Sequence, residues 1–310
     1  MGVALCAALA PGCARTTLVL PVTLAPAAPT KPAPTRPLRT YESAVNVIAA
    51  IMVSDLALPL PSRFTVFVFP TRAAYAGGLA NTGLMPASRA AEIAEYSVGL
   101  GHHRQLFLND GALRGACGST WLAVLTHELT HSAQYELSGG RRGRSEQWIR
   151  EGMAAWVAYR VLDRLGEATF GDQRERAARE VVGAWRALQD RGLDLVDLGR
   201  PRGWEARHRR PGGQAQYRLA FLLTDELIRR GGWERLLEYF RAFAGSDDRF
   251  GNFDRAFGLS LDEFERQALE SLGHQYAGRD PTGITAPRAR DVSGEFPVIG
   301  NADPCPVDSD

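Results

Sequence analysis

The sequence predicts an α+β protein, in which a small mixed β-sheet packs on a long helix and a mainly helical region follows. Residues 63–69 alternate and are rich in β-branched and aromatic side chains, which is typical of a strand. Apolar residues recur at helical spacing between residues 118 and 140, and again over 146–165, which predicts two long helices. The chain after residue 165 shows almost only the helical pattern, so we expect the strands in the first half.

The composition is that of a soluble globular protein with a sizeable core. The chain has 310 residues, of which 45% are hydrophobic and 23% are charged. This length favours one domain, residues 41–277, built of two lobes at about 41–140 and 141–277. The formal net charge of +1 argues against a general nucleic-acid binder, and we expect no nucleic-acid partner. The sequence leaves the oligomeric state open.

The first forty residues differ in character from the rest. An apolar run at 3–10 precedes Cys13, which resembles a bacterial lipoprotein signal over residues 1–13, although it carries no Lys or Arg before the run. Residues 14–40 are rich in Pro and Ala and are predicted to form a tether. We therefore expect an exported protein that attaches to a membrane through a lipidated Cys13; an unstructured cytoplasmic tail is the alternative.

Two further cysteines bear on the compartment. In an oxidising compartment Cys117 and Cys305 could form one disulfide or could both stay free thiols, and the sequence does not decide between these alternatives. The tail that carries Cys305, residues 278–310, is predicted to be irregular.

The remaining elements follow from local patterns. Ser138-Gly139-Gly140 ends the first long helix, and Ser260 to Glu263 form a capping box for the last one. Residues 200–210 (RPRGWEARHRR) are interpreted as a basic loop. The expected helices are 41–58, 73–80, 170–190, 214–230 and 233–243, and the further expected strands are 95–100 and 104–108, around a solvated pair His102-His103.

The most informative motif is His127-Glu128-Leu129-Thr130-His131, an H-E-x-x-H sequence. On a helix, residues four apart lie on one face, so both His127 and His131 can direct a ring nitrogen at one metal ion. Glu128 lies about 100° further round the helix, beside the metal, where it can take a proton from a bound water. A catalytic zinc usually takes three protein ligands and leaves one position for water.

The third ligand is predicted to be Glu151. It lies at the start of the second long helix, after residues 132–150 that allow the first helix to end and the chain to turn back. Apolar neighbours of Glu151, among them Trp148 and Trp156, are expected to pack that helix down and hold the carboxylate near the histidines.

With HELTH at 127–131 and WIREGMAAW at 148–156, the chain resembles the gluzincins, and most closely the small bacterial peptidase MA-like domains related to aminopeptidase N and thermolysin. Weaker similarity extends over 61–75 and 215–240. The resemblance implies a zincin-like fold and a zinc-dependent peptidase that acts on a peptide or protein substrate. It implies one Zn²⁺ per chain, held by His127, His131 and Glu151, with Glu128 as general base and acid.

The resemblance has further implications and two departures. Tyr217 stands where aminopeptidase N-type enzymes place an oxyanion-stabilising tyrosine, although a packing role is the alternative. Residues 95–108 would supply the strand that forms one wall of the substrate cleft. The aminopeptidase motif for the free amino end is absent, and Ala155 replaces the thermolysin aspartate that orients one histidine. A metal-bound histidine usually needs such an acceptor, and the sequence does not identify one.

Two other functional classes stay open at this point. The chain could be a non-catalytic zinc-binding surface protein of gluzincin type, although a structural zinc usually has four protein ligands and needs no base such as Glu128. It could also be a zinc hydrolase of a non-peptide bond, because the same activated water attacks other electrophiles.

Overall fold

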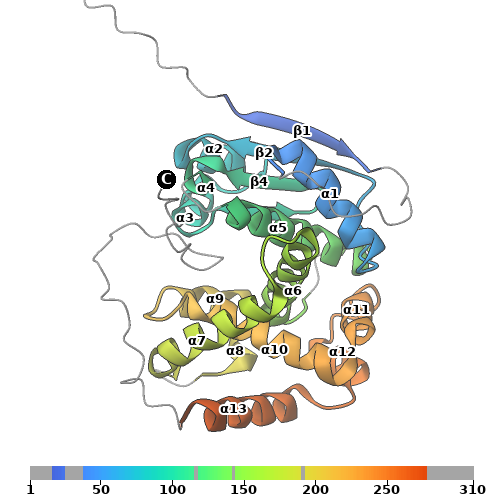
Figure 1. Cartoon of the computed structure of the whole chain (residues 1–310), viewed down its shortest axis with the longest axis vertical. Helices are drawn as coiled ribbons and strands as arrows, with labels where there is room; N and C mark the ends of the chain where they lie inside the picture. Colours follow the sequence, from blue (N-terminus) through green and yellow to red (C-terminus); the bar gives the residue numbers. More distant parts are fainter. Residues whose placement is uncertain (1–15, 25–37, 115–117, 142–143, 190–192, 278–310) are drawn as a thin grey trace, which may run out of the picture.

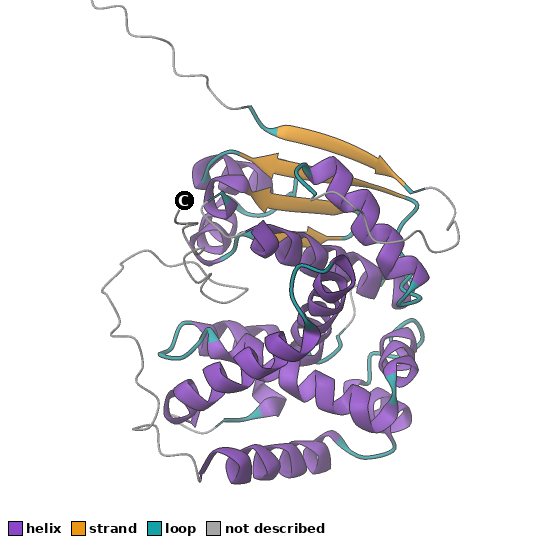
Figure 2. Cartoon of the chain, in the orientation of Figure 1, coloured by secondary structure: helices purple, strands orange, loops and turns teal. Residues whose placement is uncertain are grey.

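The computed structural model describes residues 16–24, 38–114, 118–141, 144–189 and 193–277. A four-stranded sheet lies at one end of the molecule with helices on both faces, and helices alone form the other end (Figures 1 and 2). We call these parts the sheet half and the helical half. The predicted α+β class with a small mixed sheet is confirmed.

The sheet has the order β1-β2-β4-β3. Its strands are β1 (Leu18–Thr23), β2 (Arg63–Phe69), β3 (Gly99–His102) and β4 (Gln105–Asn109). β2 and β4 are parallel, whereas β1 on β2 and β3 on β4 are antiparallel. β3 is therefore an edge strand among the described residues, and its outer side faces away from β4.

The helices of the sheet half are α1 (Tyr41–Ser54), α2 (Arg72–Asn81), α3 (Ala87–Tyr96), α4 (Asp110–Leu113) and α5 (Gly118–Leu137). Those of the helical half are α6 (Gln147–Leu165), α7 (Phe170–Gln189), α8 (Leu195–Leu198), α9 (Pro201–His208), α10 (Ala215–Gly231), α11 (Trp233–Ala242), α12 (Arg249–Phe257) and α13 (Leu261–Ala277). None of the described helices is both long and apolar enough to cross a membrane.

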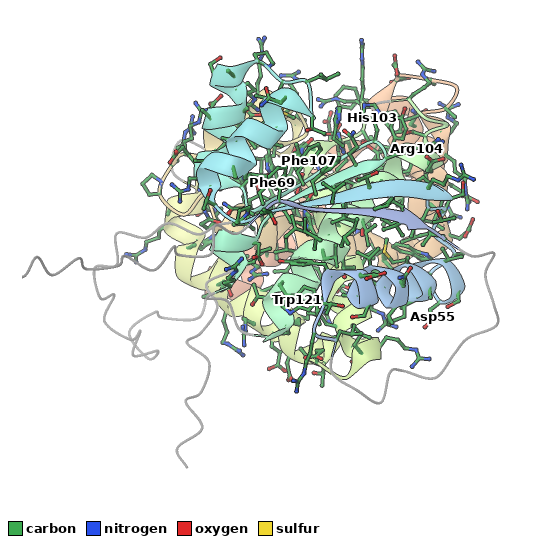
Figure 3. All side chains as sticks on the ribbon, turned by 90° about the horizontal axis from the view of Figure 1, so that it is seen from above. Asp55, Phe69, His103, Arg104, Phe107 and Trp121 are labelled. Atoms are coloured by element: carbon green, nitrogen blue, oxygen red, sulfur yellow. The ribbon has the colours of Figure 1, made fainter. Side chains whose placement is uncertain are left out.

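Side chains that alternate along β2 and β4 pack into two hydrophobic cores, one on each face of the sheet. Successive strand residues point to opposite faces, so Val66 packs toward α1 and α5 while Phe69 packs with Phe107 beneath α2 and α3. Seen from above, Phe69 and Phe107 lie on the side of α2 and α3, and Trp121 of α5 lies across the sheet (Figure 3). The sheet is thus fixed from both faces, which gives α5 a rigid support.

Helix α6 is the central element that joins the halves. It packs on α5 and on α10, and it is buried around most of its circumference. Gly152 allows α10 to come close, since a Cβ there would overlap the carbonyl oxygen of Ala220 and the hydroxyl of Thr224. The helix ends at Gly166, whose left-handed backbone (φ 74°) lets its N–H bond back to the last turn.

The structure corrects part of the tether that was predicted over residues 14–40. Residues Leu18–Thr23 form β1 and pair with β2, with Val22 buried in the main core. The segment LVLPVT has the β-branched alternation of a strand, and Pro21 is tolerated because β1 lies at the sheet edge. Residues 1–15, which include Cys13 and the predicted signal, lie outside the described residues, as do Cys117 and Cys305.

Two more predictions were wrong, for residues 200–210 and for residues 95–100. The basic loop 200–210 contains helix α9, which starts with Pro201 at its first position, where the missing N–H costs nothing. The strand predicted at 95–100 begins only at Gly99, because residues 87–96 form α3. Helices α3, α4, α8 and α12 were also not predicted, whereas the predicted helices end within a few residues of those observed.

Candidate metal centre

Helix α5 presents the two histidines of the motif on one face, as predicted. Their rings meet edge to face, with centroids 4.9 Å apart. The Nε2 atoms of His127 and His131 lie 3.1 and 3.8 Å from the same oxygen, Oε2 of Glu151. One ligand atom from each of the three residues lies within 4.8 Å of the others, so the group can hold a metal ion.

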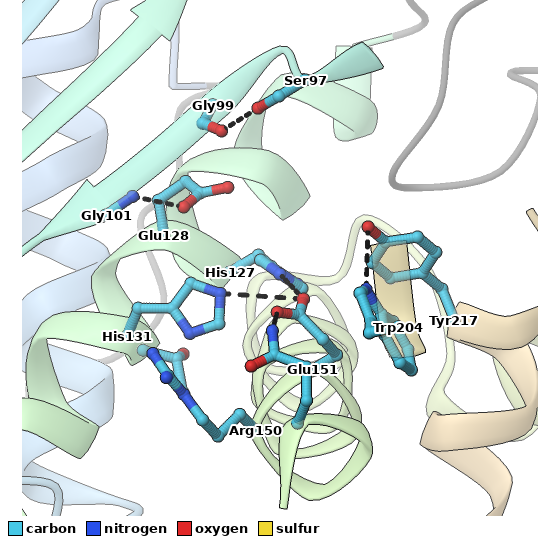
Figure 4. A network of polar contacts seen from close by, with 12 residues as sticks. Ser97, Gly99, Gly101, His127, Glu128, His131, Arg150, Glu151, Trp204 and Tyr217 are labelled. Carbon is cyan, nitrogen blue, oxygen red and sulfur yellow. Dashed lines mark hydrogen bonds and ion pairs between the residues drawn. The ribbon is translucent and has the colours of Figure 1, made fainter. Parts of the chain in front are cut away.

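Helix α6 brings Glu151 to this position. Its first turn is held down by Trp148 and Ile149, which are fully buried, and the Trp148 ring stacks on Phe264 with centroids 5.8 Å apart. Gln147 Nε2 donates to Glu151 Oε1 at 2.8 Å. This leaves Oε2 of Glu151 directed at the two histidines (Figure 4). The carboxylate is therefore preorganised, with one oxygen held by a side chain and the other available to a cation.

The structure supplies the acceptor for His131 that the sequence did not identify. Its Nδ1 lies 2.9 Å from Oε1 of Gln134, whose amide nitrogen in turn donates to the carbonyl of Arg150 at 2.9 Å. Gln134 follows His131 by three residues on the same helix face, a spacing that is readable in the sequence once the metal site is assumed. His127 Nδ1 is buried and meets no acceptor among the described residues, in agreement with the presence of Ala155.

Glu128 lies beside this group, against strand β3. The backbone N–H of Gly101 donates to its Oε2 at 2.5 Å. A Cβ at Gly99 would stand 2.8 Å from Glu128 Cγ, and one at Gly101 would overlap the Glu128 backbone carbonyl. Both glycines lie on the strand face toward α5, so β3 approaches the motif helix only because these positions lack side chains.

The charges of the metal-free group follow from burial and proximity. Burial raises the pKa of Glu128 to about 7, the neighbouring charge of Glu151 adds to this, and His127 opposes it. Burial alone would also raise the pKa of Glu151, but the charge of His131 and the hydrogen bond with His127 lower it to about 2. Burial lowers the pKa of His131 to about 4, whereas the contact with Glu151 raises that of His127 despite burial.

These directions fit a cation site. Glu151 is ionised at neutral pH and His131 is neutral, so both offer lone pairs to a cation. Two imidazoles and one carboxylate form a donor set that zinc accepts.

Tyr217 lies in the first turn of α10 and lines the same cleft as the metal group. Trp204 Nε1 donates to its hydroxyl at 3.4 Å, and the two rings meet edge to face at 4.9 Å (Figure 4). Burial and the nearby charge of Glu151 raise its pKa well above the usual value, so the phenol keeps its proton. Its hydroxyl is thus available as a donor in the cleft.

A cleft of about 1640 Å³ runs between the halves and exposes the metal group. One wall is β3 with the segment 82–86 and α3, and the opposite wall is the start of α6, the segment 199–209 and Tyr217. Both His102 and His103, which were predicted as a solvated pair, line the cleft and are half-buried. His103 follows the strand end in a left-handed conformation (φ 55°), which frees its ring from strand alternation and packs it on Tyr135.

No protein family, no curated protein and no solved structure was found that matches the chain.

Proposed function

We propose that this protein is a zinc-dependent peptidase of the gluzincin type with a zincin-like fold. The observation that carries the proposal is the convergence of His127, His131 and Glu151 on one point in an open cleft, with Glu128 held beside them by β3. A purely structural zinc would need a fourth protein ligand and a closed site, whereas here the group faces the cleft.

The proposed mechanism assigns each residue a role. His127, His131 and Glu151 would hold the zinc, which when bound supplies a Lewis acid that polarises a carbonyl and lowers the pKa of water. Glu128 accepts the proton of the water that attacks the scissile carbonyl, and then delivers it to the leaving amine. The pKa of about 7 belongs to Glu128 in the metal-free group, and a zinc ion bound beside it would lower that pKa.

Two further parts of the cleft support a peptide substrate. The outer side of the edge strand β3 can pair with an extended peptide through main-chain hydrogen bonds, as strand addition requires. The neutral hydroxyl of Tyr217 is a donor for the oxyanion that forms when the carbonyl is attacked.

The experiment is digestion of a peptide library by the full chain loaded with zinc, repeated with a chelator and after zinc is restored. We expect cleavage that the chelator abolishes and zinc recovers. The Glu128→Gln variant should keep its zinc and lose about 10²- to 10⁴-fold in kcat, because only the proton carrier is removed. Turnover by Glu128→Gln at the parent rate would exclude the base role. Zinc binding without cleavage of any peptide would favour the non-peptide or non-catalytic alternatives.

A further inference from the structure

Positively charged side chains outnumber negatively charged ones along the lining of the cleft. Apart from the metal-centre carboxylates, the described lining residues include seven arginines but only two glutamates, Glu136 and Glu205. The arginines are Arg89, Arg104, Arg144, Arg150, Arg200, Arg209 and Arg249. Because the whole chain carries a net charge of only +1, this excess is local to the cleft.

At one end of the cleft the charges cancel. There α3 and α9 are joined by four side chains, which we call the α3–α9 clasp: Arg89, Glu92, Glu205 and Arg209. Arg89 pairs with Glu92 at 2.7 Å and also with Glu205, and Arg209 pairs with Glu92. Two guanidinium groups thus face two carboxylates. Beside the turn after β3, Arg104 is similarly matched by Glu136 at 3.5 Å.

At the opposite end, beside the start of α6, the charges do not cancel. Arg249 pairs at 3.1 Å with Glu146, whose carboxylate is fully buried. The charge of Arg200 also acts on Glu146, and Arg200 forms no ion pair within the described part of the chain. Arg144 is 75% exposed, and its nearest carboxylate, Asp247, is 3.9 Å away. That carboxylate is closer to Arg141, at 3.3 Å.

Backbone packing holds this basic end together. The N–H of Gln147 donates to the carbonyl of Gly199 at 2.9 Å, which places the first turn of α6 alongside Arg200. Gly199 has no room for a side chain, since a Cβ there would overlap the Glu146 carboxylate. The segments 144–150 and 199–200 therefore form one surface, although they are far apart in the sequence.

Arg150 connects this surface to the metal centre. It precedes Glu151 on α6, and its carbonyl is tied through Gln134 to His131. Its positive charge acts on both His131 and Glu151, and Figure 4 shows its side chain beside His131. An anionic group bound near Arg150 would therefore lie close to the bond that is cut.

We propose that the cleft selects acidic peptides, and that Arg144, Arg150 and Arg200 bind aspartate or glutamate side chains of the substrate next to the scissile bond. Guanidinium groups suit this role because they stay charged and donate two parallel hydrogen bonds to a carboxylate. The neutral α3–α9 clasp offers no such excess, so the acidic residues belong on one side of the cleaved bond. This inference rests on the proposed peptidase function for its substrate.

The first test measures binding rather than cleavage, so that it stands apart from the proposed activity. The zinc-loaded Glu128→Gln chain is titrated into a fluorescent decapeptide rich in glutamate, and into the same peptide with glutamine at those positions. We expect the glutamate peptide to bind about tenfold more tightly or better at low salt, and the difference to shrink as salt is added. Equal binding of the two peptides would overturn the proposal, whether or not the parent cleaves peptides.

The second test locates the preference. Arg144→Gln and Arg200→Gln are combined in one variant, and the control combines Arg202→Gln with Arg210→Gln, two exposed arginines that do not line the cleft. Both variants lose two positive charges. The cleft variant should lose most of the preference for the glutamate peptide, while the control keeps it. If both variants lose the preference equally, the preference depends on net charge alone, and the assignment to Arg144 and Arg200 is wrong.

Cleavage by the parent then separates the two proposals. Library peptides cut by the zinc-loaded chain should be enriched in Asp and Glu on one side of the bond, and the cleft variant should raise KM for them about tenfold with kcat little changed. Cleavage without this enrichment would refute the specificity and leave the peptidase intact. Selective binding without cleavage would support the specificity and refute the peptidase.

Discussion

At the scale of single residues, the candidate site depends on two glycines as much as on the side chains that they adjoin. Gly99 and Gly101 let β3 approach α5 closely enough for the Gly101 N–H to hold Glu128 at 2.5 Å. The carboxylate of Glu128 thus has one oxygen fixed by β3, and Glu128 still lines the cleft. The position of the proposed base is thus set by an edge strand and not by the motif helix alone.

We predict that Gly101→Ala reduces activity by about 10²-fold, because the added Cβ must displace the Glu128 backbone and meets His131 Cβ at 3.1 Å. The measurement is kcat/KM on a cleaved peptide, together with circular dichroism to confirm the fold. Gly183→Ala is the control: it lies on α7 with nothing within 4 Å of the new Cβ, and should raise the free energy of unfolding by about 0.5–1 kcal/mol. Full activity in Gly101→Ala would show that the close approach of β3 is unimportant.

We also predict that Gln134→Ala weakens zinc binding by about 10- to 100-fold, since His131 Nδ1 then loses its acceptor. Competition with a chromophoric chelator gives the affinity. Gln173→Ala on α7, away from the cleft, should leave the affinity unchanged. If the two variants bind zinc equally well, Gln134 does not orient the ligand.

At the scale of helices and strands, α6 carries both the third ligand and the main contact between the halves. Its Gly152 lies against α10 with no space for a methyl group. We therefore predict that Gly152→Ala lowers the free energy of unfolding by about 1–3 kcal/mol through overpacking. Denaturant unfolding of this variant beside Gly183→Ala would test it, and a stability equal to the parent's would show that the two helices can separate without cost.

The same scale shows what the sequence could and could not predict. The helices with a clear cap or an apolar stripe, such as α5 and α6, were predicted almost to the residue, because local pattern determines them. Helix α9 was missed because RPRGWEARHRR has little apolar periodicity, and its helicity depends on Trp204 and Arg207, which are buried by tertiary contacts. β1 was missed because its strand pattern is short and lies in a Pro-rich segment, and only pairing with β2 fixes it.

For the site, the three predicted ligands come together because helical spacing and the packing of α6 suffice to place them. The roles of Gly101 and Arg150 were not predictable, since each depends on which residue of another element lies opposite. Gln134 lies on the same helix as His131, and its three-residue spacing could have indicated the contact once the metal site was assumed. Tyr217 was placed in the cleft as the resemblance implied, and its role in catalysis stays a prediction.

At the scale of the whole molecule, the cleft between the halves is where the metal group, the edge strand and the basic surface meet. The ligands come from the last element of the sheet half and the first element of the helical half. A metal ion would therefore bridge the two halves directly. Export and lipid attachment through Cys13 remain predictions that concern residues outside the described chain.

The measurement that tests the central claim most directly is the zinc content of the purified full chain by elemental analysis, for the parent and for His127→Ala, His131→Ala and Glu128→Gln. The account predicts one zinc per chain in the parent and in Glu128→Gln, and a large loss of zinc in both histidine variants. A parent chain that binds no zinc, or histidine variants that keep full occupancy, would contradict it.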